Sequence, residues 1–268
     1  MRRLIVAALV LASGASALAQ NQPTTPPTAR AAAPTDFTGY WVAVVTEDWR
    51  WRMMTPAKGD VSSIPVTAEG RRTAEAWDPA KDIADGEQCR AYGAAGIMRM
   101  PVRLHVTWQD DNTLKVDIDN GTQTRLLHFD ANAKPPSAPE WQGFSLAKWE
   151  SILEGQGQAP FAGGQAGGQN ALGANSLSGS IRITTTQMRS GYLRRNGVPY
   201  SANAVLTEFL DRTSEPNGDS WLVLTSIVED PRYLQIPLML TTHYKREPDG
   251  SKFRPRPCEV TPPVAPVR

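Results

Sequence analysis

The stretch Val102–Phe129, VRLHVTWQDDNTLKVDIDNGTQTRLLHF, predicts two successive β-hairpins. Apolar residues alternate with polar ones over residues 102–109 and again over 114–119, which is the period of a half-buried strand. Asp110-Asp111-Asn112 indicates the first turn, and Asn120-Gly121 is the strongest short hairpin signal in the chain. We therefore expect a three-strand antiparallel meander here.

The same pattern recurs on both sides of this stretch, so the whole domain is expected to be rich in strands. Helix is scarce: Thr67 can cap one short helix that ends at Ala76, before Asp78-Pro79. An α/β fold needs a helix at each crossover, and this chain lacks them. We predict an all-β, mainly antiparallel domain, a single barrel or barrel-like sandwich of about eight to ten strands, because closure removes exposed edges. The further strands are expected at 37–46, 144–149, 180–188, 204–212, 221–229 and 238–245.

The first nineteen residues have the pattern of an export signal. Arg2 and Arg3 precede a short apolar run, and Ala17-Leu18-Ala19 is a small-x-small cleavage site. We therefore expect a periplasmic or secreted protein. The expected organisation is a signal peptide (1–19), a Pro-rich linker (20–35), a barrel-like domain (36–258) with a mobile insertion rich in Gly, Ala and Gln (155–179), and a loose tail (259–268).

Charge and composition exclude several classes of function. The chain has 28 Lys and Arg against 27 Asp and Glu, so electrostatics gives no argument for a nucleic-acid partner. No later apolar run is long enough for a membrane-spanning helix. Two Cys and three His are too few for a zinc finger or an iron–sulfur protein, and we expect neither a metal site nor a cofactor.

The two cysteines, Cys89 and Cys258, are expected to form a disulfide, because export places them in an oxidising compartment. The alternative is two buried free thiols.

The turn assignments place a charged residue inside the barrel. A two-residue Asn120-Gly121 turn puts Arg125 and Gln123 on the apolar face of the meander, whereas a one-residue slip would turn Arg125 outward. An inward guanidinium needs a carboxylate or an anionic ligand. Glu208, between Leu206 and Leu210, is the candidate partner and also a candidate acid–base group. The alternatives are an Arg125 that reaches solvent at the barrel mouth and an exposed Glu208.

Aromatic and histidine side chains supply further candidates. Eight tryptophans include Trp41 and Trp108, which either pack the core or line a ligand pocket. His105 faces Asp117 across the first hairpin, either as part of a solvated sheet face or as a catalytic pair. His243 is a second, weaker catalytic candidate. The three histidines lack metal-ligand spacing, and a three-His metal site would have to be assembled in space.

Several local patterns resemble a family of exported bacterial proteins whose function is uncharacterised. They are EDWRWRMMTP at 47–56, the W-x-G-x-S-x-x-x-W-E string at 141–150, GYLRRNGVPYSANAVLTEFLDR at 191–212 and NGDSWLVLTSIVEDPRYL at 217–234. The resemblance runs from about Phe37 to Cys258 and implies export and a β-rich fold, without an activity or site residues. Gly39-x-Trp41 also resembles the G-x-W that opens lipocalin-type barrels.

Three functions are consistent with these features. The leading hypothesis is an exported barrel that binds a small, partly apolar ligand in its interior, such as an apolar or aromatic acid. Arg125, Gln123, Glu208, Trp41 and Trp108 would form that site. The second is an isomerase, lyase or hydrolase with Glu208 or a histidine as acid–base group, and the third is a structural envelope-interaction protein with a filled core. An apolar cavity with one anchoring charge would favour the first, and a packed interior the third.

Overall fold

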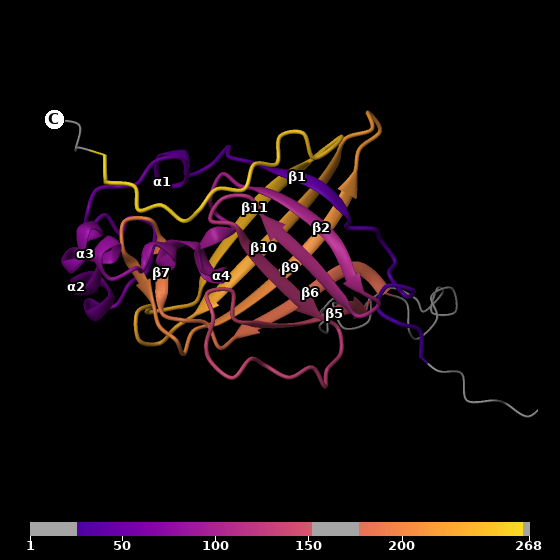
Figure 1. The fold of residues 1–268 in the computed structure, drawn as a ribbon, viewed down its shortest axis with the longest axis horizontal. Coiled ribbons are helices and arrows are strands. Elements are labelled where there is room, and N and C mark those ends of the chain that lie inside the picture. Colours follow the sequence, from indigo (N-terminus) through magenta and orange to yellow (C-terminus); the bar gives the residue numbers. More distant parts are fainter. Residues whose placement is uncertain (1–25, 152–176, 265–268) are drawn as a thin grey trace, which may run out of the picture.

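Nine strands close into a barrel in the part of the chain that the computed structural model describes, residues 26–151 and 177–264 (Figure 1). The predicted export signal and most of the predicted insertion lie outside these residues. The all-β, barrel-type prediction is confirmed. The strands are β1 (Gly39–Val44), β2 (Arg103–Asp110), β3 (Thr113–Ile118), β4 (Gln123–His128), β5 (Phe144–Ser151), β6 (Leu177–Thr186), β9 (Val205–Ser214), β10 (Ser220–Glu229) and β11 (Leu238–Glu247).

The strand order around the barrel is β1-β11-β10-β9-β6-β5-β4-β3-β2. Every neighbouring pair is antiparallel except β4 and β5, which run parallel and are joined by the long connection 129–143. The register of the central meander is as the two turns predict. It pairs Leu104 with Ile118, Val116 with Arg125, and Ile118 with Gln123.

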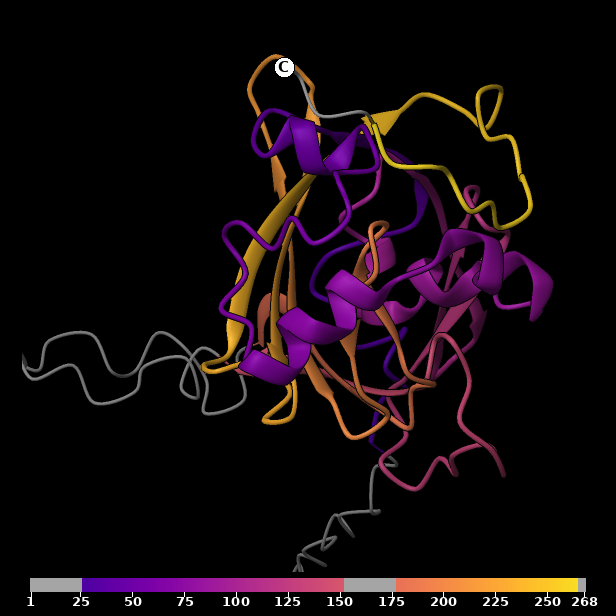
Figure 2. The same cartoon turned by 90° about the vertical axis from the view of Figure 1, so that its left-hand side faces the viewer.

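A layer of short helices and one hairpin covers one end of the barrel, on the left of Figure 1 and toward the viewer in Figure 2. We call it the cap. Only α2, the one helix of the described residues longer than seven residues, was predicted from the sequence. The cap consists of α1 (Trp49–Arg52), α2 (Ala68–Ala76), α3 (Pro79–Ala84), the 3₁₀ helix η1 (Gln88–Tyr92), α4 (Ala94–Ile97), β7 (Gly191–Arg194) and β8 (Val198–Tyr200).

Two local signals explain why the sequence analysis missed part of the cap. Asp78-Pro79 ends α2, but it also starts α3: the Asp78 side chain accepts hydrogen bonds from the first turn, and Pro79 occupies the first helical position. Asn196-Gly197 belongs to the turn of the β7–β8 hairpin. Gly197 has φ +83°, and a Cβ there would lie 2.2 Å from Trp77, so this turn requires glycine.

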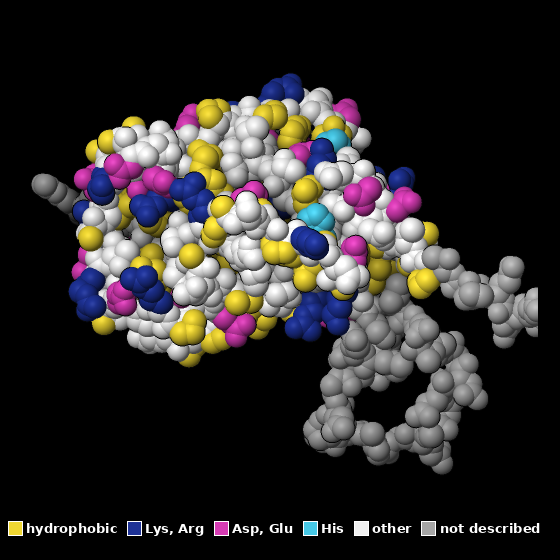
Figure 3. All heavy atoms as spheres, turned by 60° about the horizontal axis from the view of Figure 1, so that its bottom comes forward, with side chains coloured by type: hydrophobic (Ala, Val, Ile, Leu, Met, Phe, Trp, Pro, Cys, Tyr) yellow, Lys and Arg dark blue, Asp and Glu magenta, His cyan; other side chains and the backbone are white. Residues whose placement is uncertain are grey.

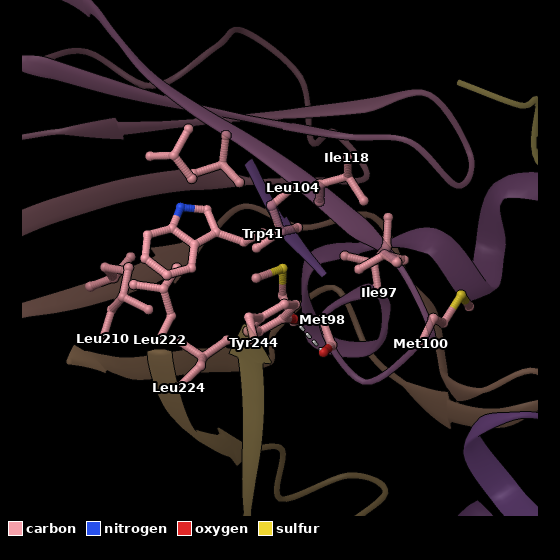
Figure 4. Close-up of a cluster of buried hydrophobic side chains, with 14 of the residues drawn as sticks. Trp41, Ile97, Met98, Met100, Leu104, Ile118, Leu210, Leu222, Leu224 and Tyr244 are labelled. Carbon is pink, nitrogen blue, oxygen red and sulfur yellow. Dashed lines mark hydrogen bonds between the residues drawn. The ribbon is translucent and has the colours of Figure 1, made fainter. Parts of the chain in front are cut away.

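Large apolar side chains fill the barrel (Figure 4). Trp41 is fully buried among them, and its indole nitrogen donates to the Phe37 carbonyl oxygen at 3.1 Å. Met98 enters the barrel from the segment after α4, and its carbonyl oxygen accepts from the Tyr244 hydroxyl at 2.7 Å. Each fully buried side chain of this size contributes about 1.5–3 kcal/mol, so the interior is a core that ties cap and barrel together.

The C-terminal segment lies along the cap. Cys89 and Cys258 are within disulfide distance, with their Cα atoms 5.1 Å apart, as predicted. Beyond them, the amide and carbonyl of Glu259 both bond the Tyr92 hydroxyl, and the amide of Val264 donates to the carbonyl oxygen of Thr55. The sequence analysis expected a loose tail here, and the described part of it makes these specific contacts.

The surface carries charges of both signs. On the face drawn in Figure 3, basic and acidic side chains are interspersed. Within residues 26–151 and 177–264, no helix is long and apolar enough to cross a membrane.

The disulfide is expected to be a major source of stability, because it closes a loop of 169 residues in the unfolded chain. The C89S/C258S double variant should lose up to about 5 kcal/mol in free energy of unfolding, measured with urea. Reductant should lower the wild-type value toward that of the variant and leave the variant unchanged. Equal wild-type curves with and without reductant would contradict the prediction.

Candidate functional site

Arg125 on β4 and Glu208 on β9 form an ion pair inside the barrel. Their side chains are 3% and 0% exposed, and the guanidinium donates to both carboxylate oxygens, at 2.6 and 3.2 Å. The same guanidinium donates to the Thr185 hydroxyl on β6 at 3.2 Å. The expectation that Arg125 points inward and pairs with Glu208 is therefore confirmed.

The surroundings of this pair are closely packed. The cavity beside Arg125 has a volume of about 20 Å³, and aliphatic side chains such as Leu104, Ile183 and Leu224 form most of its wall. This is space for about one water molecule. Both Glu208 oxygens are occupied by Arg125, so the pair satisfies itself, and the ligand-binding and acid–base roles expected of these two residues stay predictions.

The other sequence candidates lie apart from this cavity. Trp41 belongs to the core, and Trp108 is half-buried and packs on Phe129 with ring centroids 5.7 Å apart. The Gln123 amide donates to the Gly121 carbonyl oxygen and accepts from Gln142. His243 is a half-buried residue of β11.

His105 does not bond Asp117. It stacks on Tyr40, with the ring centroids 4.1 Å apart. The search for metal sites over the described residues finds no group of three or more His, Cys, Asp or Glu side chains that could hold an ion.

A second cavity, of about 40 Å³, lies where α1, α4, β7 and β11 meet. We call it the arginine pocket. Its apolar wall includes Ile64, Met100, Leu193, Leu238 and Leu240, and four arginines are among its lining residues, Arg52, Arg99, Arg194 and Arg195.

Positive charge exceeds negative charge at this pocket. Asp48 is the one carboxylate among the lining residues, and it pairs with Arg99 at 2.7 Å. Glu47 pairs with Arg52 and stands 3.4 Å from Arg99. The third nearby carboxylate, that of Asp60, forms an ion pair with the exposed Arg50, with nitrogen and oxygen 3.7 Å apart. Arg52 and Arg99 thus each have a carboxylate partner, but the lining arginines outnumber the carboxylates near them.

Two of these arginines have buried nitrogen atoms without a hydrogen-bond partner, Nη2 of Arg52 and Nη1 of Arg194. A buried N–H without an acceptor costs about 1–3 kcal/mol, and more when it is charged. Burial lowers the pKa of Arg194 to about 10, and burial together with Arg99 lowers the pKa of Arg52. Arg125 also has an unpartnered Nε, but its charge is matched by Glu208. At the arginine pocket, missing acceptors and excess charge occur together.

Neighbouring groups hold these guanidinium groups in place. Trp51 is stacked between Arg50 and Arg194, at 4.8 and 4.9 Å from its ring centroid, and its indole nitrogen donates to Asp60 at 3.1 Å. Asp48 adopts a left-handed backbone conformation with φ +54°, which is unusual for a residue other than glycine.

The sequence analysis did not identify the arginine pocket. Its residues come from segments 48–52, 95–100, 193–195 and 238–240 and from Ile64, which no single period or motif connects. A usable signal was present in EDWRWR and YLRR, which together hold four arginines against two acids and have aromatic residues within one or two positions of the arginines.

Comparison with known proteins gives no further assignment: no protein-family model, curated protein or solved structure matches this chain. The resemblance to an exported family therefore stays a prediction.

The buried ion pair leads to a prediction about stability. R125A would leave the Glu208 carboxylate buried without a partner, so the variant should lose about 3–5 kcal/mol in free energy of unfolding. The double variant R125A/E208A should recover part of that loss. The matched control is R232A, whose exposed pair with Glu69 should contribute less than about 1 kcal/mol. Equal losses for R125A and R232A would contradict the prediction.

Proposed function

We propose that this protein is an exported binding protein for a small, partly apolar organic acid, held in the arginine pocket. The observation that carries the proposal is the pair of buried, unpartnered nitrogen atoms on Arg52 and Arg194 beside a cavity with excess positive charge. A carboxylate supplies the two things this site lacks, an acceptor for each nitrogen and a negative charge. The export pattern at 1–19 supports a location outside the cytoplasm.

The wall of the pocket supports an acid that carries hydrocarbon. Leu193, Leu238 and Leu240 line the same pocket as the arginines, so a ligand held by its carboxylate would have apolar surface for its hydrocarbon chain. Each buried methylene contributes about 0.8 kcal/mol, which adds affinity without further polar contacts.

The volume favours an aliphatic acid over an aromatic one. A cavity of about 150 Å³ accommodates benzene, and the arginine pocket measures about 40 Å³. A carboxylate and its first carbons fill that space, whereas an aromatic ring exceeds it. Catalysis by Glu208 has no comparable support, because both of its oxygens accept hydrogen bonds from Arg125.

The proposal is tested by calorimetric titration with a series of linear acids from acetate to octanoate. R194Q should weaken binding by about tenfold or more, because it removes a charge-assisted hydrogen bond. R232Q, at an exposed arginine away from the pocket, should leave the affinity unchanged. The proposal fails if no acid of the series binds the wild type, or if both variants bind equally well.

The affinity should also depend on pH, with a sign set by Arg194. The pKa of Arg194 is about 10 in the folded protein, below its ordinary value, because burial disfavours the charged guanidinium. Folding therefore carries a free-energy cost at neutral pH, and this cost decreases as the pH rises above about 10 and the guanidinium loses its proton. A bound carboxylate requires the charged form. Binding of acetate or butyrate should therefore be constant between about pH 7 and 9 and weaken above about pH 10. R194Q should lack this decline, and a wild-type affinity that stays constant to about pH 11 would exclude Arg194 as the anchor.

A further inference from the structure

A third cavity, of about 240 Å³, lies on the cap between α2, α3 and the β7–β8 hairpin. We call it the aromatic groove. Both Figure 1 and Figure 2 show these elements side by side at the capped end of the barrel. Aromatic side chains contribute a large part of its lining, those of Trp77, Tyr192, Tyr200 and Tyr233.

The size of the groove suits a ring. Its volume of about 240 Å³ exceeds the roughly 150 Å³ that accommodates benzene, and it is several times that of the arginine pocket. A six-membered ring with substituents therefore fits in the aromatic groove and does not fit in the arginine pocket.

The charges of the groove are balanced, in contrast to those of the arginine pocket. Lys81 and Arg90 stand with Asp78 and Asp82. Arg90 donates to Asp82 at 3.1 Å, and Lys81 pairs with the neighbouring Asp85 at 2.8 Å. The groove therefore has no excess charge that would favour a charged ligand.

A fixed hydrogen-bond network forms one wall. The buried Asp82 carboxylate accepts from the Trp77 indole at 2.8 Å, from the Tyr192 hydroxyl at 3.0 Å and from Arg90. Burial is the largest cause of a raised pKa at Tyr192, and the negative charge of Asp82 is the second. The Tyr192 hydroxyl therefore stays protonated. This wall is held in one arrangement before any ligand binds, so a ligand would not have to order it.

Two polar atoms of groove residues have no partner, the Nε of Arg90 and the hydroxyl of Tyr200, and both are buried. Glycines make room for that hydroxyl: a Cβ at Gly93 would lie 2.0 Å from it, and one at Gly191 would lie 2.6 Å away. Both atoms are donors, so each can be satisfied by a neutral oxygen acceptor.

We propose that the aromatic groove is a second binding site, for a neutral ring that carries hydroxyl groups, that is, a monosaccharide unit. Such a ring has apolar faces for the aromatic lining and ether and hydroxyl oxygens for the unpartnered donors. It brings no charge, which matches the balanced charges of the groove. A hydrocarbon ring would leave the donors unsatisfied. A uronic acid would add a negative charge that the groove does not need, because Arg90 already pairs with Asp82 and Lys81 with Asp85.

The test is a titration of the full-length protein with glucose and, separately, with glucuronate, followed by saturation-transfer NMR and tryptophan fluorescence. We expect glucose to bind, and glucuronate to bind no more tightly than glucose. The blocking variant is S190W, which places a large side chain at an exposed residue of the groove lining, and its matched control is S251W, at an exposed residue outside that lining. S190W should weaken glucose binding by about tenfold or more, and S251W should not.

The same titration separates the two sites. R194Q should bind glucose as the wild type does, and S190W should bind butyrate as the wild type does. The inference is overturned if glucose does not bind, if glucuronate binds about tenfold more tightly than glucose, or if S190W retains wild-type glucose affinity while circular dichroism shows it folded. None of these outcomes bears on the organic acid in the arginine pocket.

Discussion

The interior of this barrel depends on the ion pair between Arg125 and Glu208. The two residues lie on β4 and β9, which are separated by β5 and β6, so their contact joins strands that are not neighbours in the wall. A buried guanidinium can be tolerated only with a partner, and here the chain supplies it. Side chains pack closely around the pair, and the cavity beside it has space for about one water molecule. Two larger cavities lie at the cap.

The cap is held rigidly enough to form such sites. Met98 and Tyr244 connect it to the barrel interior, and the disulfide at Cys89 together with Tyr92 fixes the C-terminal segment against it. Elements too short to be stable alone are thereby ordered by tertiary contacts. The two cavities of the cap differ in charge, one with excess arginine and one balanced, so a single layer of short elements presents two chemically different surfaces.

The barrel could be predicted from the sequence because the signals for its strands and turns lie within short stretches of the chain. Alternation of apolar and polar residues defines each strand, and the Asn120-Gly121 turn defines the register that places Arg125 inside. The cap carries no such pattern. Asp78-Pro79 ends one helix and begins another, and β7 and β8 are too short to show a period. The arginine pocket combines residues from five separate parts of the chain, and only the folded chain reveals which carboxylates lie near its arginines.

The contrast between Arg125 and Arg194 is the reason for proposing an acid site at the arginine pocket and not at the buried pair. Both arginines are buried, and interactions in the folded protein have to offset the hydration that their guanidinium groups lose. Glu208 offsets it permanently for Arg125, so an added anion would have nothing to stabilise. For Arg194 the loss is only partly offset, which is why burial lowers its pKa to about 10. An anion that binds there recovers this free energy and stabilises the cap at the same time, since a ligand that binds only the folded state stabilises it. In the proposed function, the incomplete neutralisation of the arginine pocket would therefore supply both affinity and selectivity for an acid.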